Sequence, residues 1–215
     1  MSTQRAKTQV FWAAFTDELQ KIADVEKTRT LSAFEKELEP GDVLLTSLNK
    51  PQSMKGRVFR RLSNIIQGDR GHAALYAGDG KVFETQFGEK AKLKHLRQVV
   101  QNRDVSAYRP KATAEQKIKA LQRAREMLGA PYGGTFGVFT KMLLSKYLPL
   151  SARKPKDTKD RLYCSNMVTR AYDTSFGLKR HPELIYPSEL LSAPKLTHVA
   201  EFRNWGRHQP GSRKE

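Results

Sequence analysis

The 215-residue sequence contains one cysteine, Cys164, and no long apolar run. A single thiol excludes an internal disulfide and the cysteine-rich zinc sites. The longest apolar stretches, residues 10–15 and 138–150, are too short or too interrupted by polar side chains to span a membrane. Residues 10–15 are also too short for the apolar core of a secretory signal. We therefore expect a protein that is cytoplasmic as synthesised.

Acidic residues are scarce: the chain has 22 aspartates and glutamates against 39 lysines and arginines, and a net charge of +17. Such a charge attracts polyanions, which include nucleic acid, anionic lipid head groups and acidic wall polymers. The basic residues are dispersed, and aromatic residues are not interleaved with them as a platform for stacking single-stranded bases requires. A solvated basic surface and an anion-binding surface both fit this pattern.

Hydrophobic residues make up 38% of the chain, which indicates one globular domain with a substantial core. Apolar periodicity and turn residues divide the sequence into an N-terminal helical extension (1–38), a central domain (39–202) and a basic C-terminal tail (203–215). The predicted strands are residues 42–46, 72–77, 81–85, 104–108 and 198–202. The predicted helices are residues 5–38, 58–66, 113–128, 136–148 and 163–176, with a helical turn at 187–191.

Cys164 lies where the predicted helix 163–176 begins. A thiol in a first helical turn faces unpaired backbone N–H groups and the positive end of the helix dipole, which lower its pKa and favour the thiolate. A free cysteine is also one of the most buried residue types and often acts only as a small hydrophobe. Cys164 is therefore either a packed side chain or a nucleophile, depending on whether a base lies beside it.

The best candidate for that base is His72, in a predicted hairpin of residues 72–85. If Ala77 pairs with Lys81 around a three-residue turn, His72 and Glu84 project from the same face as diagonal neighbours. A helix that starts at Cys164 and packs on that face would complete a Cys–His–Glu arrangement, in which the carboxylate orients the imidazole. A histidine and a glutamate on a hairpin are also ordinary features, so spacing alone leaves both interpretations open.

The other histidines do not share metal-ligand spacing, and the glycine cluster at residues 129–134 lacks the Gly-Lys-Ser/Thr ending of a phosphate-binding loop. We therefore expect neither a metal nor another cofactor.

Five motifs follow one another along residues 40–200. They are GDVLLT (41–46), GHAALYAGDGKVFET (71–85), GAPY (129–132), YCSNMV (163–168) and YPSEL (186–190). In this order they resemble the permuted NlpC-type papain-like cysteine peptidases and amidases, most closely the YiiX/YaeF-like branch. In these permuted proteins the histidine strand precedes the cysteine helix, as it does here.

The resemblance implies an α+β fold of the circularly permuted papain-like (NlpC-type) class. In that fold an antiparallel sheet or half-barrel packs against the helix that carries the cysteine, and the catalytic domain spans residues 39–202. It implies Cys164 as the nucleophile, His72 as the base and Glu84 as the orienting residue. Members of the family cleave amide or ester bonds through an acyl-enzyme.

Tyr132 either borders the cleft and contacts substrate or is a packed aromatic after the turn at Pro131. We group it with Tyr163 and Ser165 as the substrate-binding residues. The backbone N–H of Cys164 would hold the oxyanion, together with a second donor that the sequence does not identify. Many members have Glu where this chain has Asn166, a position we interpret as structural.

We therefore predict a monomeric thiol hydrolase that cleaves an amide bond in a peptide-like substrate, for example one derived from the cell wall. A lipid acyl hydrolase or acyltransferase with the same triad is an alternative, favoured by the basic surface. A basic protein associated with nucleic acid or virions, with a degenerate site, is another. Because no export signal is recognised, a cell-wall substrate would require lysis, a phage particle or a dedicated secretion system.

Overall fold

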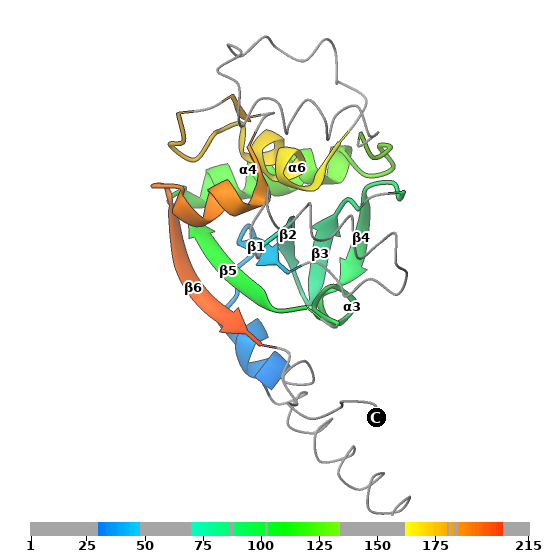
Figure 1. Cartoon of the computed structure of the whole chain (residues 1–215), viewed down its shortest axis with the longest axis vertical. Coiled ribbons are helices and arrows are strands. Elements are labelled where there is room, and N and C mark those ends of the chain that lie inside the picture. The colour runs from blue at the N-terminus through cyan, green and yellow to red at the C-terminus, as the bar shows by residue number, and fades with distance from the viewer. Residues whose placement is uncertain are drawn as a thin grey trace, which may run out of the picture.

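An antiparallel sheet forms the centre of the protein in the computed structural model, which describes residues 30–47, 70–86, 88–101, 103–133, 162–179, 181–182 and 185–203 (Figure 1). Its six strands lie in the order β4-β3-β2-β1-β5-β6. The strands are β1 (Val43–Thr46), β2 (His72–Gly78), β3 (Lys81–Glu84), β4 (Lys92–His95), β5 (Val105–Pro110) and β6 (Leu196–Phe202). The predicted helices 58–66 and 136–148, most of the N-terminal extension and most of the C-terminal tail lie outside the described residues.

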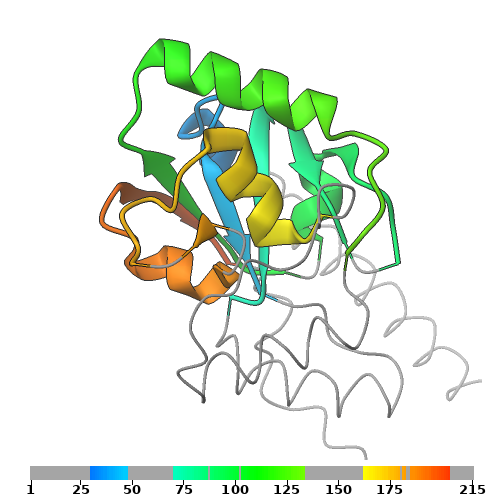
Figure 2. The same cartoon turned by 90° about the horizontal axis from the view of Figure 1, so that it is seen from above.

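Two helices cover one face of this sheet. Helices α4 (Ala114–Glu126) and α6 (Cys164–Tyr172) lie side by side above the strands, and the short 3₁₀-helix η2 (Pro187–Ser192) contacts β1, β2 and β6 (Figures 1 and 2). Their apolar side chains share a core with Val43, Leu45 and Ala73. Helix α3 (Leu96–Val100) and the helical residues 30–36 pack against the other face, where Leu44 lies. Strand β1 is therefore buried on both faces, which explains its continuous apolar run.

The hairpin of β2 and β3 follows the predicted register over most of its length. Leu75 pairs with Phe83, as the sequence predicts, but the predicted three-residue turn is wrong because Gly78, not Ala77, pairs with Lys81. Asp79 (φ 49°) and Gly80 (φ 64°) form a two-residue turn with both φ angles positive. Asp-Gly favours this turn, whose twist matches that of the strands, and the extra residue is taken up by a bulge at residue 77.

The two helices above the sheet begin where the sequence indicates. Thr113 caps α4 by accepting a hydrogen bond from the backbone N–H of Gln116. The sequence predicts this cap, because threonine is a preferred residue at the start of a helix. Helix α6 begins at Cys164 but ends at Tyr172, four residues before the predicted end, because Asp173 takes the left-handed conformation (φ 53°). The predicted stop at Gly177 is wrong: an aspartate ends the helix first, as short polar residues sometimes do.

Strand β4 and helix α3 are not among the predicted elements. The sequence of β4 is Lys-Leu-Lys-His, and its side chains are mostly exposed. Its strand geometry comes from pairing with β3 at the edge of the sheet, and lysine is typical of such edges. Among the described residues, no helix has the length and apolar character needed to cross a bilayer.

Candidate active site

The thiol of Cys164 lies at the first residue of α6, and only 7% of this residue is exposed. Tyr163 precedes it in extended conformation, so the chain turns sharply into the helix. Burial raises the pKa of Cys164, but the hydrogen bond from His72 and the backbone groups of Ala73 and Ser165 outweigh it, so the net pKa is lowered. These are the conditions that favour a thiolate.

The imidazole of His72 lies between this thiol and a carboxylate. Its Nε2 is 2.7 Å from Oε1 of Glu84, which leaves Nδ1 as the ring nitrogen for Cys164. Burial lowers the pKa of His72, but the hydrogen bonds with Cys164 and Glu84 outweigh it and raise the pKa to about 9. The two shifts have one cause: a thiolate and an imidazolium stabilise each other when they are close and shielded from water.

Glu84 ends β3 and is 1% exposed, yet three positively charged or protonatable groups surround it. Oε1 accepts from His72 and also from Arg103 NH1 at 3.1 Å, and Oε2 lies 2.7 Å from Lys94 Nζ. Burial raises the pKa of this carboxyl, but its bond with His72 and the two cations hold the pKa well below its usual range. Glu84 is therefore a carboxylate that accepts from the imidazole at neutral pH.

The way in which the helix reaches the hairpin differs from the sequence-based expectation. By alternation, His72 and Glu84 belong to the sheet face that carries Val82, whereas α6 packs on the face that carries Ala73. Cys164 therefore meets His72 where β2 begins, beside the backbone of Ala73, and not across the face beneath the helix. The prediction was wrong because alternation gives the face of a side chain but not the position along the strand at which a helix end arrives.

Tyr132 lies beside the segment that leads into α6. It forms a parallel bridge with Leu162, and Gly133 donates its N–H to the carbonyl of Leu162 at 2.8 Å. Burial and the charge of Cys164 raise the pKa of its phenol, so the hydroxyl keeps its proton throughout the physiological range. The sequence-based grouping of Tyr132 with the cysteine thus has a geometric basis. Its contact with substrate stays a prediction.

Tyr163 and Ser165 flank the cysteine, and both are buried. The hydroxyl of Ser165 donates to the carbonyl of Ile185 at 2.6 Å, which ties the first turn of α6 to the segment before η2. In the described structure this hydroxyl supports the helix start, while the backbone of Ser165 faces the thiol. Substrate contact by either residue stays a prediction.

Two charged residues of the site were not recognised from the sequence. Lys94 lies on β4, a strand that periodicity does not reveal, and Arg103 precedes β5. Their signal would have been the pairing of β4 with β3, which brings Lys94 diagonally beside Glu84. Within the described ranges, no three His, Cys, Asp or Glu side chains gather as a metal site would require.

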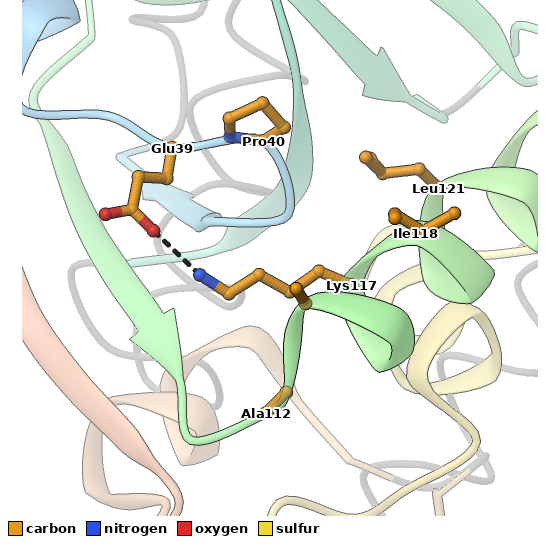
Figure 3. A pocket seen from close by; sticks show the side chains of 7 residues that line it. Glu39, Pro40, Ala112, Lys117, Ile118 and Leu121 are labelled. Atoms are coloured by element: carbon orange, nitrogen blue, oxygen red, sulfur yellow. Dashed lines mark hydrogen bonds and ion pairs between the residues drawn. The ribbon is translucent and has the colours of Figure 1, made fainter.

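A separate pocket of about 320 Å³ lies between residues 39–40 and the first turns of α4 (Figure 3). Nearby along the chain, Tyr172, the last residue of α6, donates its hydroxyl to the carbonyl of Gly41. The pocket is largely apolar apart from an ion pair between Glu39 and Lys117 at 2.8 Å. Its lining includes Glu39, Pro40, Ala112, Lys117, Ile118 and Leu121. It contains none of the groups that surround Cys164.

Comparisons with known proteins agree with this geometry. The sequence model of a family described as permuted papain-like amidase enzyme, YaeF/YiiX, C92 family, matches residues 37–200. The crystal structure of metalloprotein YiiX from Escherichia coli O157:H7 (DUF1105) is similar, with 18% sequence identity and a TM-score of 0.51. The alignment covers 77% of this chain and 98% of that one, and at this identity it supports the fold alone. No significant match was found among curated proteins.

Proposed function

Because the chain belongs to the permuted papain-like amidase family of YaeF and YiiX, C92, we propose that it hydrolyses an amide bond through an acyl-Cys164 intermediate. The observation that carries the proposal is the chain of contacts from Cys164 through His72 to Glu84. A merely packed cysteine needs no imidazole beside it, and a merely structural histidine needs no thiol. Their contact inside the protein, with a carboxylate behind the ring, is the arrangement of an activated nucleophile.

The reaction begins with the thiolate of Cys164 attacking the carbonyl carbon, so that a C–S bond forms and the carbonyl oxygen becomes an oxyanion. As this tetrahedral species collapses, the C–N bond breaks and the His72 imidazolium gives its proton to the leaving amine. The neutral imidazole then takes a proton from water, and the resulting hydroxide attacks the thioester. Release of the carboxylic acid restores the thiolate and the imidazolium.

The oxyanion requires donors at the start of α6. The backbone N–H of Cys164, at the positive end of the helix, is the first donor. The phenol of Tyr132 is our candidate for the second, because it lies beside the segment that enters the helix and keeps its proton. Glu84 takes no part in bond breaking: it holds the tautomer and orientation of His72.

We take a peptide-like amide as the substrate because the family description names an amidase. The basic charge favours a second candidate, acyl transfer or hydrolysis on a lipid in an anionic bilayer, by the same three residues. Of the 39 basic and 22 acidic residues, the described ranges hold 18 and 13, a net charge of +5 out of +17. Most of the excess charge therefore belongs to other segments and not to the part that carries Cys164.

A thiol-directed probe with an electrophilic acyl group tests the nucleophile. We expect the wild-type protein to be labelled at pH 7 on the peptide that contains Cys164, and Cys164→Ala to remain unlabelled. The sharper control is His72→Ala, which keeps the thiol but removes its activation, and whose labelling should fall to the rate of the urea-unfolded protein. Equal labelling of wild type and His72→Ala would refute the proposal.

The substrate class is tested separately. Wild type and Cys164→Ala are incubated with a mixed peptide library and, in parallel, with vesicles of phosphatidylcholine containing phosphatidylglycerol or none. New amine and carboxyl termini in the first mixture support the amidase. Release of fatty acid, with flotation that depends on the anionic lipid and is weakened by salt, supports the lipid alternative. Salt-sensitive binding of nucleic acid without turnover by either route would favour a degenerate site.

A further inference from the structure

The carboxylate of Glu84 is anchored at both oxygens, and the outer anchor is a lysine. Lys94 Nζ lies 2.7 Å from Oε2, the oxygen that His72 does not use. Strand β4 sets this distance, because Val82 pairs with Lys94 and Glu84 pairs with Lys92, so that the Lys94 side chain extends diagonally to the carboxylate. Only 18% of the Lys94 side chain is exposed, so the pair is largely shielded from water.

A carboxylate that is 1% exposed cannot satisfy a second oxygen with bulk water. With Lys94 in place, Oε2 is fixed at the edge of the sheet and Oε1 stays on the imidazole. Without it, Oε2 would be a buried, charged oxygen with no cation beside it, and rotation of the carboxylate to find another donor would weaken its bond to His72. The lysine thus acts on the ring through the carboxylate and does not itself touch the reacting atoms.

We propose that Lys94 is a positioning residue of the Cys164 site, which holds Glu84 against His72 and whose positive charge favours the thiolate of Cys164. This inference rests on the proposed function insofar as it assumes that the Cys164–His72 pair does chemistry. The position of Lys94 relative to Glu84 does not depend on that assumption.

The charged groups around the pair come from several elements. His72 is faced by Glu84 from β3 and by Cys164 from α6. Behind Glu84 are Lys94 from β4 and Arg103 from the segment before β5. Among the described residues, two more titratable groups lie nearby: the phenol of Tyr132, whose pKa responds to the charge of Cys164, and Glu89, which lies 3.2 Å from Lys94.

The direction of the effect follows from the signs of these charges. Removing the Lys94 ammonium takes a positive charge away from both members of the pair. The thiolate is then less favoured, so the pKa of Cys164 rises. A weaker bond between Glu84 and His72 has the same consequence for the thiol, because it destabilises the imidazolium that stabilises the thiolate. The pH at which Cys164 becomes a thiolate should therefore move upward by about one pH unit, the size expected for the loss of one partly shielded charge.

Alkylation of Cys164 by iodoacetamide measures this shift without any substrate. Because the chain has one cysteine, the rate of alkylation against pH reports on this thiol alone. The matched variants are Lys94→Met, Lys94→Arg and Lys92→Met. Lys92 lies on the same strand and removes the same charge, but its side chain is 46% exposed and pairs with Glu89 at 2.9 Å.

We expect the alkylation profile of Lys94→Met to move upward by about one pH unit, and those of Lys94→Arg and Lys92→Met to stay within about 0.2 units of wild type. The inference is overturned if Lys94→Met lowers the alkylation rate equally at every pH. It is also overturned if the alkylation profile of Lys94→Met shifts no further than that of Lys92→Met. Circular dichroism of each variant identifies loss of the fold, and Lys94→Gln then provides a second neutral replacement.

The same measurement separates this inference from the proposed function. A wild-type thiol that titrates like an ordinary cysteine, near pH 8.5, would contradict the activated pair itself. A wild-type thiol that is reactive well below that pH, with an unshifted Lys94→Met, would contradict only the role of Lys94.

Discussion

Two buried carboxylates lie at opposite ends of the sheet, and similar ion pairs have different roles at the two places. Asp42, just before β1, is fully buried and accepts two hydrogen bonds from Arg109, at 3.0 and 2.9 Å, and one from the backbone of Glu39. Glu84, at the end of β3, is almost as deeply buried and contacts two cations, Lys94 and Arg103, but its third partner is His72.

The third partner makes the difference. An arginine and a backbone amide do not change charge at physiological pH, so the Asp42 cluster can only hold the turn before β1 against β5. A histidine can gain and lose a proton in that range, so the charges around Glu84 act on a group that can titrate. A buried carboxylate with cations is thus no sign of function until it contacts a side chain that titrates.

The largest effect should come from replacing Glu84 by Gln. The neutral amide no longer stabilises the imidazolium, so hydrolysis per folded molecule should fall by about 100-fold or more, as for the orienting residue of a triad. Some stability should be lost as well, because Arg103 and Lys94 lose their carboxylate. Turnover normalised to the folded fraction from circular dichroism checks the expectation, and an unchanged normalised rate would mean that Glu84 resembles Asp42.

Replacing Asp42 by Asn should have the complementary result. The free energy of unfolding should fall by about 2 kcal/mol, less than for a fully buried pair because Arg109 is partly exposed. Thiol reactivity of Cys164 in the folded protein should stay as in wild type. Urea unfolding and iodoacetamide alkylation measure the two quantities, and a loss of thiol reactivity without unfolding would break the distinction between the two ends.

The pH dependence of turnover sharpens the contrast further. The pKa of His72 is raised to about 9, so the imidazolium that protonates the leaving amine is present below that pH and is lost as the pH rises through it. Turnover should therefore fall about tenfold for each pH unit above 9. An Asp42→Asn variant that remains folded should lose turnover over the same alkaline range. If the turnover of the wild-type protein already falls near pH 6.5, the pKa of His72 is not raised.

The smallest expected change serves as a calibration. Replacing Thr113 by Ala removes the cap of α4, which packs near the Asp42 end of the sheet, and should cost about 1 kcal/mol. Thermal unfolding measures the loss, and the alkylation rate of Cys164 should not change. A slower alkylation would show that the two ends of the sheet are coupled through the helices.

Local signals in the sequence predicted the elements whose conformation depends on their own residues. Alternation gave the register of Leu75 with Phe83, and the Thr113 cap gave the start of α4. The turn at Asp79 and Gly80 was misjudged because Gly78 makes a longer turn equally plausible from composition. The strand that carries Lys94 was missed because neighbours, and not periodicity, make it a strand.

The residues of the candidate site also differ in how well the sequence predicts them. Cys164, His72 and Glu84 were predicted to lie together from a motif order and a hairpin register, and the structure has His72 in contact with both of the others. Lys94 and Arg103 were not predicted, because nothing in the local sequence distinguishes them from the other lysines and arginines among the 39 basic residues. Only the fold distinguishes the two that reach a buried carboxylate from those that face solvent.

The order of the elements along the chain has a consequence for the protein as it is being made. Strands β1 to β5 lie within residues 43–110, whereas the helix that carries the thiol follows at Cys164–Tyr172. On the ribosome, the imidazole and its carboxylate can therefore pair in a hairpin while the cysteine has yet to emerge. The nucleophile of the proposed mechanism then arises only late in synthesis, in a chain of which five of the six strands have already emerged, which limits the time during which such a thiolate meets unfolded neighbours.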